Sequence, residues 1–393
     1  MLMQSAIFNV LLFMILFSIA RIISDKTKGI ILEPLFLSVV YLVCFMTGIL
    51  PTDGLDGSGI PTMMTAFGLF LIVTNLGTMI ELRRLFHEWR TVLICLGSMA
   101  VMAVLFYTVG IAVYGRHYAL SALPPVAGAL VAGTLVVQAA EAAGMPQYGA
   151  FAMLIVSLQS FVSVPIATIM MRKYTKKMVA EGTHLADPIP MNKSWPNFKL
   201  IKSWPRIFSD STLMVTRLFI VCFIAILVSL ITGGAIPVAV AMLVLGIVFT
   251  EIGFLEPQTL SRSGYLTFMM MALMMTIPVS YKTITWDGLV SMLLPLLFFL
   301  VLGVVGLTIG GLVVGKLVKV DWRLSVAIAL SAMFGYPLTE FVARAVVTAY
   351  HLPPEEEEKM LNNVMPQLII AGFTSVSIAS VFLAGVVAPT IFK

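Results

Sequence analysis

Long apolar runs, separated by short polar or basic segments, dominate the chain. The runs are unbroken, whereas membrane β-barrels need alternating stretches of about ten residues. A bilayer core of about 30 Å accommodates about 20 apolar residues in a helix. The pattern therefore predicts an all-α polytopic membrane protein with about ten transmembrane helices. We expect spans at residues 4–20, 30–50, 61–80, 91–114, 149–171, 213–233, 236–250, 264–280, 288–315 and 363–390.

Two further apolar stretches, 123–145 and 324–349, are interrupted by polar residues, glycine and proline. We expect each to be a broken or re-entrant hairpin. Each follows four spans and precedes a fifth, and an odd number of spans turns the second half upside down. The order predicts two inverted five-helix repeats, as in secondary transporters. The repeats would be residues 1–172 and 213–393, joined by a cytoplasmic linker at 173–212.

Basic residues indicate the orientation of these spans. Lys and Arg gather in the segments 21–29, 81–90, 172–177 and 316–323. Because cytoplasmic loops carry an excess of these residues, we expect both termini to lie outside. The loops 51–59, 115–121 and 281–288 would then face outward. Charged residues make up only 11% of the chain, far below the 25% or so of soluble domains, which agrees with a lipid environment.

Few motifs for other chemistry are present. The three cysteines, Cys44, Cys95 and Cys222, lie in apolar runs without metal-binding spacing. No nucleotide-binding signature and no pairing of a nucleophile with a base are visible. We therefore expect no enzyme activity, no cofactor, no metal beyond a coupling sodium ion and no nucleic-acid partner.

Ionisable residues at membrane depth are costly and usually functional. The clearest are Glu141, Glu340 and Arg344, all within the interrupted stretches. Arg344 is a candidate to bind a substrate carboxylate, since its planar fork suits bidentate contact. Glu340, one helical turn earlier, would hold Arg344 in the empty site, and Glu141 would bind a cation or carry a proton. We expect the two glutamates to occupy related places in the two repeats.

Polar neighbours and helix breakers complete the candidate substrate site. Gln138 accompanies Glu141, and Thr339 accompanies Glu340. Gly335 and Pro337 interrupt the second hairpin, as Gly144 and Pro146 interrupt the first. Backbone groups freed at such breaks offer partial charges to ions. The predicted substrate-binding residues are Arg344, Glu340, Thr339, Gln138 and Gly335.

Small hydroxyl residues cluster directly after each interrupted stretch. Segment 157–165 contains Ser157, Gln159, Ser160 and Ser163, and segment 367–380 contains a second set. Close helix packing is one explanation; a sodium site of oxygen ligands is the other. The candidate cation ligands are Glu141, Ser157, Ser160, Gln367, Thr374, Ser375 and Ser377.

Five glycines in the segment 303–315 predict a close helix contact rather than a site.

The order of elements resembles the bacterial sodium/glutamate symporters and the related 2-hydroxycarboxylate transporters. The local likeness lies in GALVAGT at 128–134, in MFGYPLTE at 333–340 and in the hydroxyl-dotted last span. The first hairpin departs from the glycine-rich pattern of these families, with VVQAAEAAG at 136–144. The resemblance implies a homodimer in a bacterial inner membrane that moves its substrate by an elevator mechanism.

The leading hypothesis is secondary active transport, most simply sodium-coupled symport of a small organic anion or amino acid such as glutamate. The alternative is a cation/proton antiporter that uses Glu141 and Glu340. A channel or a membrane sensor is a third class; the paired interrupted stretches disfavour a sensor, and a channel should show flux without countertransport or coupling.

Overall fold

The computed structural model is built almost entirely of helices. It describes residues 5–27, 33–185, 199–201, 204, 210–282, 284–335 and 338–392. Helices make up 83% of the structure, and no strand occurs in the described part. Six described helices are long and apolar enough to cross a membrane, and six shorter helices are also apolar. The prediction of an all-α membrane protein is therefore confirmed.

The helices follow the order that the apolar pattern predicts, and several begin at a polar cap. The side chains of Asp210, Thr285 and Asp321 each accept a hydrogen bond from a backbone N–H of the helix that follows. The main elements before residue 186 are α1 (Ala6–Lys26), α2 (Glu33–Met46), α3 (Ile60–Met63), η3 (Met64–Gly68), α4 (Leu69–Thr78), α5 (Leu82–His87), α6 (Trp89–Leu105), η4 (Phe106–Gly110), α7 (Ile111–Ala142) and α8 (Pro146–Ala180). The later elements are α9 (Ser211–Ile231), α10 (Val238–Glu251), α11 (Thr259–Arg262), α12 (Leu266–Val279), α13 (Trp286–Leu317), α14 (Trp322–Leu330), η7 (Ser331–Met333), α15 (Leu338–Thr348), α16 (Pro354–Phe373), η8 (Thr374–Ala379) and α17 (Ser380–Val387).

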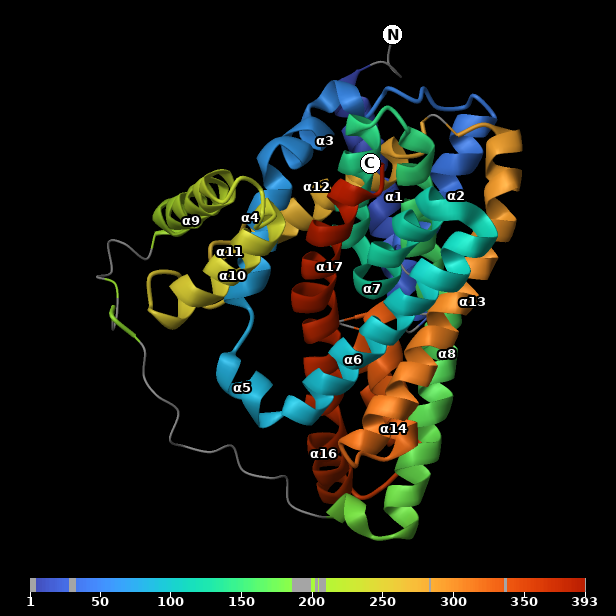
Figure 1. Cartoon of the computed structure of the whole chain (residues 1–393), viewed down its shortest axis with the longest axis vertical. Coiled ribbons are helices and arrows are strands. Elements are labelled where there is room, and N and C mark those ends of the chain that lie inside the picture. The colour runs from blue at the N-terminus through green and yellow to red at the C-terminus, as the bar shows by residue number, and fades with distance from the viewer. Residues whose placement is uncertain are drawn as a thin grey trace.

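The loops sort into two ends of the molecule, here called upper and lower as in Figure 1. At the upper end, Lys282 forms an ion pair with Asp56 at 3.1 Å. At the lower end, Lys177 forms an ion pair with Asp321 at 2.9 Å. The sequence predicts the same grouping, because it assigns 51–59 and 281–288 to one side and 172–177 and 316–323 to the other.

Helices α6 and α13 pack closely along their glycine faces. A Cβ atom built at Gly306 would lie 2.8 Å from the Cα of Met102, and one built at Gly97 would lie 2.7 Å from Val314. The residue numbers rise on one helix as they fall on the other, so the pair is antiparallel. The expected close contact of the segment 303–315 is confirmed.

Helix α7 contains two reversals of direction. At the first, Gly115 has φ +80°, a left-handed conformation that suits glycine. A Cβ built at Gly110 would lie 3.3 Å from Ala119 Cβ, although residues nine positions apart in a straight helix are separated by about 13 Å. The chain therefore turns back into the molecule after Gly115.

The second reversal follows from contacts with the first turn of α8. The rings of Tyr118 and Tyr148 are 5.1 Å apart, and a Cβ at Gly149 would lie 3.1 Å from the Cα of Val137. In a straight helix, residues 118 and 137 would be about 28 Å apart. Because both contact adjacent residues of α8, the chain descends from Tyr118 and returns before Val137.

Helices α14 and α15 form a similar excursion from the lower end. Asp321, just before α14, pairs with Lys177 near the end of α8. Tyr350, just after α15, donates a hydrogen bond to the carbonyl oxygen of Arg172, also on α8. The chain therefore rises through α14 and η7 and returns through α15. Gly335, with φ +60°, lies at the turn, and Pro337 lies outside the described residues.

Candidate functional site

The turns of the two excursions meet inside the molecule. Gly128, in the first excursion, packs so closely on Ser380 of α17 that a Cβ atom there would overlap the serine side chain. The 3₁₀ turn η7, at the top of the second excursion, contacts α7, α8 and η8. Its residues Ser331, Ala332 and Met333 are buried. The two turns and the helices α8 and α17 therefore surround one interior region.

Helix α8 indicates the height of each turn. From above, a Cβ at Gly133 would lie 2.7 Å from Val156. From below, α14 and η7 rise from the Asp321–Lys177 pair by about 21 Å. The same distance along α8 from Lys177 leads to about Ser163. The interior region therefore lies beside residues 156–163 of α8.

Glu340 and Arg344 form the ion pair that their spacing predicts. Arg344 Nε donates to Glu340 Oε1 at 2.9 Å. The pair is on the exposed face of α15, where 56% of the Arg344 side chain and 29% of the Glu340 side chain are accessible. Glu340 lies close to the turn, and Arg344 lies one helical turn nearer the lower end.

Thr339 faces the interior. Its side chain is fully buried, and its Oγ1 has no hydrogen-bond partner among the described residues. The backbone N–H of Thr339 is bonded to the carbonyl of Gly335 at 3.1 Å, so the turn passes directly into α15. Thr339 and Gly335 therefore belong to the interior region, whereas Arg344 is directed away from it.

The expectation that Glu141 and Glu340 occupy related places is wrong. Glu141 is one residue from the end of α7, within electrostatic reach of Lys282 and Asp56 at the upper end. Glu340, in contrast, is near the start of α15, beside the turn of its excursion. The two segments look alike in sequence, but the likeness does not match the positions of their turns. In the first segment the chain has already turned back before Gln138, so Glu141 lies far from the turn.

Gln138 serves a helix contact. Its Nε2 donates to the carbonyl oxygen of Thr65, in the π-helix η3, at 3.2 Å. Gln138 therefore links α7 to η3.

Ser157 belongs to a buried group of three hydroxyls. Its Oγ lies 2.6 Å from Ser38 Oγ on α2 and 3.3 Å from Tyr281 Oη. Ser157 also donates to the carbonyl of Met153, one turn earlier. Its hydrogen-bonding capacity is therefore used within the protein. Ser160, which is also buried, lies one turn further along α8.

Residues Thr374–Ala379 form the π-helix η8 rather than a continuous α-helix. Thr374 is buried, and its Oγ1 has no hydrogen-bond partner in the described part of the chain. Ser375 is also buried and donates to the carbonyl of Ala371 at 2.6 Å. The side chain of Ser377 lies outside the described residues. π-helices are frequent at functional sites, which agrees with the predicted role of this segment.

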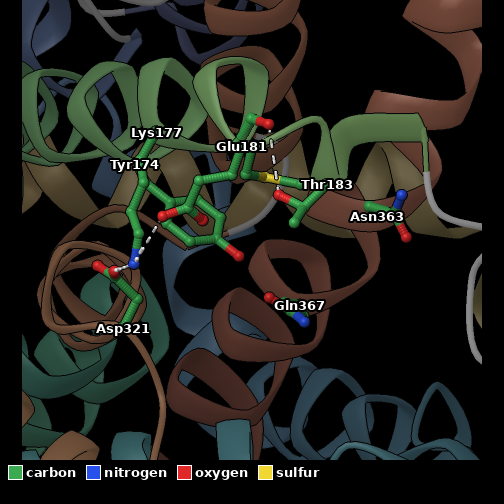
Figure 2. A pocket seen from close by; sticks show the side chains of 8 residues that line it. Tyr174, Lys177, Glu181, Thr183, Asp321, Asn363 and Gln367 are labelled. Carbon is green, nitrogen blue, oxygen red and sulfur yellow. Dashed lines mark hydrogen bonds and ion pairs between the residues drawn. The ribbon is translucent and has the colours of Figure 1, made fainter.

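Gln367 lies between two cavities at the lower end. One, of about 350 Å³, is drawn in Figure 2, where Gln367 and Asn363 of α16 line it together with Lys177 and Asp321. The other, of about 720 Å³, lies between the start of α6, α14 and α16. Both cavities include Gln367, whose Oε1 is buried without a partner among the described residues. The described chain therefore leaves open space beside α16 at the lower end.

Asp321 connects the lower end of the second excursion to α8 through its ion pair with Lys177. Burial alone would raise the pKa of its carboxyl group. The hydrogen bond from Lys177, the backbone N–H of Arg323 and both positive charges outweigh burial and hold the pKa below its ordinary value. The carboxylate is thus stabilised in its charged form.

We expect this stabilisation to be lost in acid. A carboxyl group whose pKa is lowered by folding stabilises the folded state above its unfolded pKa, about 3.9, and loses this effect as the pH falls through the folded value. Melting temperatures of the wild type and Asp321→Asn should therefore differ at pH 7 and converge below about pH 4. Asp53→Asn, in an exposed loop, is the control. A constant difference between wild type and Asp321→Asn would contradict the expected role.

Two buried polar residues were missed as candidates. Arg217, in the span predicted at 213–233, is buried and pairs with Glu256 Oε1 at 2.7 Å. Gln159 is fully buried on α8, and neither atom of its amide has a hydrogen-bond partner among the described residues. The hydroxyl-rich segment 157–165 indicates the region of Gln159, but not the residue itself. Hydroxyls recur every three residues at Ser157, Ser160 and Ser163, and again at Thr374, Ser377 and Ser380.

The fold and this interior region define an all-α membrane protein with polar groups enclosed between two chain reversals. Among the described residues, no group of three His, Cys, Asp or Glu side chains could hold a metal ion. Comparison with known proteins found no protein-family model that matches the chain and no match among curated proteins.

Proposed function

We propose that the protein is a secondary active transporter that carries a small organic anion or amino acid together with sodium. The observation that carries this proposal is the meeting of two excursions, from opposite ends, at a buried polar region beside α8. Transporters bind their substrates near the midplane, at discontinuous helices that approach from both sides. The resemblance to bacterial sodium/glutamate symporters supports the same function.

We further propose that the halves are inverted repeats of five spans. Support comes from contacts that recur with the halves exchanged. Helix α8 contacts α14, and α17 contacts α7; likewise α4 contacts α10, and α12 contacts α2. Helix α6 contacts α13, its own counterpart. By the same resemblance, the transporter would be a homodimer in a bacterial inner membrane and would work as an elevator; the distribution of Lys and Arg supports both termini lying outside.

Uptake into proteoliposomes tests the proposal. An inward sodium gradient should drive accumulation of a labelled carboxylate, either L-glutamate or citrate, and replacing sodium with potassium should abolish it. The cation/proton antiporter predicts instead that sodium dissipates an imposed pH gradient without any organic solute. Glu141 and Glu340 lie at different heights of the structure, and no observation favours their acting as one antiport site. Proton flux without solute uptake would overturn the proposed symport.

Arg344→Ala tests the predicted substrate contact, which requires the solute to reach Arg344 on the exposed face of α15, outside the interior region. We expect uptake to fall at least about tenfold, because a charged hydrogen bond to the substrate would be lost. The melting temperature should change little, since the Glu340–Arg344 pair is exposed and such pairs contribute about 0–1 kcal/mol. Arg344→Lys, which keeps the charge but loses the fork, should retain part of the uptake. Normal uptake by Arg344→Ala would exclude Arg344 from the substrate site.

A further inference from the structure

The amide of Gln159 is unusual in its lack of partners. The residue is 0% exposed, and both Nε2 and Oε1 are without a hydrogen-bond partner in the described part of the protein. Burying such a group without a hydrogen-bond partner destabilises the folded state. Buried amides in native proteins are therefore almost always bonded, to protein, water or a bound molecule.

Gln159 lies between the two chain reversals. It follows Val156, which contacts Gly133 of the upper excursion, by three residues. It precedes Ser163, the residue of α8 that lies about level with η7, by four residues. Ser163 donates to the carbonyl of Gln159 at 2.9 Å, so the backbone there is satisfied and only the amide side chain remains unpaired.

Two further unpaired hydroxyls lie on elements that meet at this region, since η8 contacts both α7 and η7. Thr339 precedes Tyr350 by eleven residues, and Tyr350 is bonded to the Arg172 carbonyl. Eleven residues back along α8 from Arg172 lead to residue 161, so Thr339 lies about level with Gln159. Thr374 is six residues below Ser380, which contacts Gly128 at the upper reversal. Both hydroxyls are buried, and neither has a hydrogen-bond partner among the described residues.

The chemistry of the amide restricts which group can pair with it. Nε2 is a donor and Oε1 is an acceptor. A sodium ion binds oxygen ligands, so it could satisfy Oε1 and the threonine hydroxyls but would leave Nε2 unpaired. A solute that presents an acceptor beside a donor satisfies both atoms at once.

We propose that Gln159 binds the transported solute directly, with Nε2 donating to an acceptor of the solute and Oε1 accepting from a donor. The hydroxyls of Thr339 and Thr374 complete this neutral part of the site. The inference rests on the proposed transport function and names its specificity-determining residue. It assigns recognition to a buried amide, in addition to any contact made by the exposed Arg344.

Thermal unfolding of the purified full-length protein tests the proposal. L-glutamate, L-glutamine and citrate are each added in sodium and in potassium, because a ligand that binds the folded state raises the melting temperature. Gln159→Met keeps a similar volume but removes both hydrogen-bonding atoms. Its melting temperature without solute should equal or exceed that of the wild type, since an unpaired buried group is removed. Its response to the solute that stabilises the wild type should be lost, with an apparent KM for uptake about tenfold higher or more.

Two further variants sharpen the test. Gln147→Met, on the exposed first turn of the same helix, should respond like the wild type. Gln159→Glu keeps the amide oxygen position but replaces the donor nitrogen by a second oxygen. It should lose the solute response, whereas a cation ligand would tolerate this change and keep the stabilisation by sodium alone.

The outcomes separate the two proposals. A wild type that responds to solute, with a Gln159→Met variant that responds equally, overturns the role of Gln159 alone. Loss of the sodium response in Gln159→Met, with its retention in Gln159→Glu, assigns the residue to the cation and also overturns direct solute binding. A wild type that neither binds nor takes up any of the three solutes overturns the proposed function, and this inference with it.

Discussion

Replacing Arg217 with methionine is expected to destabilise the protein by about 3 kcal/mol, the typical cost of removing one partner of a buried ion pair. Arg217 Nη2 donates to Glu256 Oε1 at 2.7 Å, and only 7% and 18% of the two side chains are exposed. The guanidinium also lies 4.6 Å from the ring centre of Trp204. Without Arg217, the Glu256 carboxylate would remain buried without its counter-charge. The measurement is the melting temperature in detergent.

Two variants control this experiment. Arg217→Met combined with Glu256→Gln should recover much of the loss, because the charge left behind is removed too. Arg116→Met, which loses an exposed hydrogen bond to the Thr390 carbonyl, should have little effect. If Arg217→Met has the same melting temperature as the wild type, the ion pair contributes no net stability.

Gly128→Ala is expected to impair both stability and uptake. A Cβ at this position would overlap the Ser380 side chain and lie 3.0 Å from the Ser380 Cα, which cannot swing aside. Overpacking of this kind costs about 1–3 kcal/mol. The new methyl group would also separate α7 from α17 at the upper turn, where the proposed site is formed. Uptake should therefore fall further than the change in melting temperature alone explains.

Ser380→Gly removes the overlapping atoms, so it should partly restore uptake in the Gly128→Ala background. Gly57→Ala serves as the matched control, because nothing lies within 4 Å of a Cβ there. Uptake by Gly128→Ala at the wild-type rate would mean that the upper turn can open without cost to the site.

The sequence predicts those features that depend on local pattern. The spans follow from apolar runs, and the close helix contact of the segment 303–315 follows from its glycines, although its partner α6 does not. The pair of Glu340 and Arg344 follows from their i, i+4 spacing. Gly335 has positive φ at the turn of the second excursion, as its place in the interrupted stretch suggests, whereas Gly144 lies between α7 and α8 and not at the turn of the first excursion.

Other features depend on partners far along the chain. Arg217 lies in a strongly apolar segment, so the mean hydropathy of that segment does not reveal it. Its partner in the ion pair, Glu256, lies 39 residues away. The Gln159 amide lacks hydrogen-bond partners because of all the residues that surround it in the fold, so no local sequence motif reveals this feature. The faulty match of Glu141 with Glu340 arose because sequence spacing does not show where a helix turns back.

Helix α8 extends well beyond what a bilayer needs. Its 35 residues span about 52 Å, against a hydrocarbon core of about 30 Å. The lower turns are held by the Lys177–Asp321 pair and by Tyr350, which is bonded to the Arg172 carbonyl. A rigid protrusion of this kind offers an epitope outside the detergent micelle. An antibody fragment bound to this epitope would add mass outside the micelle. Particle images of a small, largely embedded protein could then be aligned in electron cryo-microscopy.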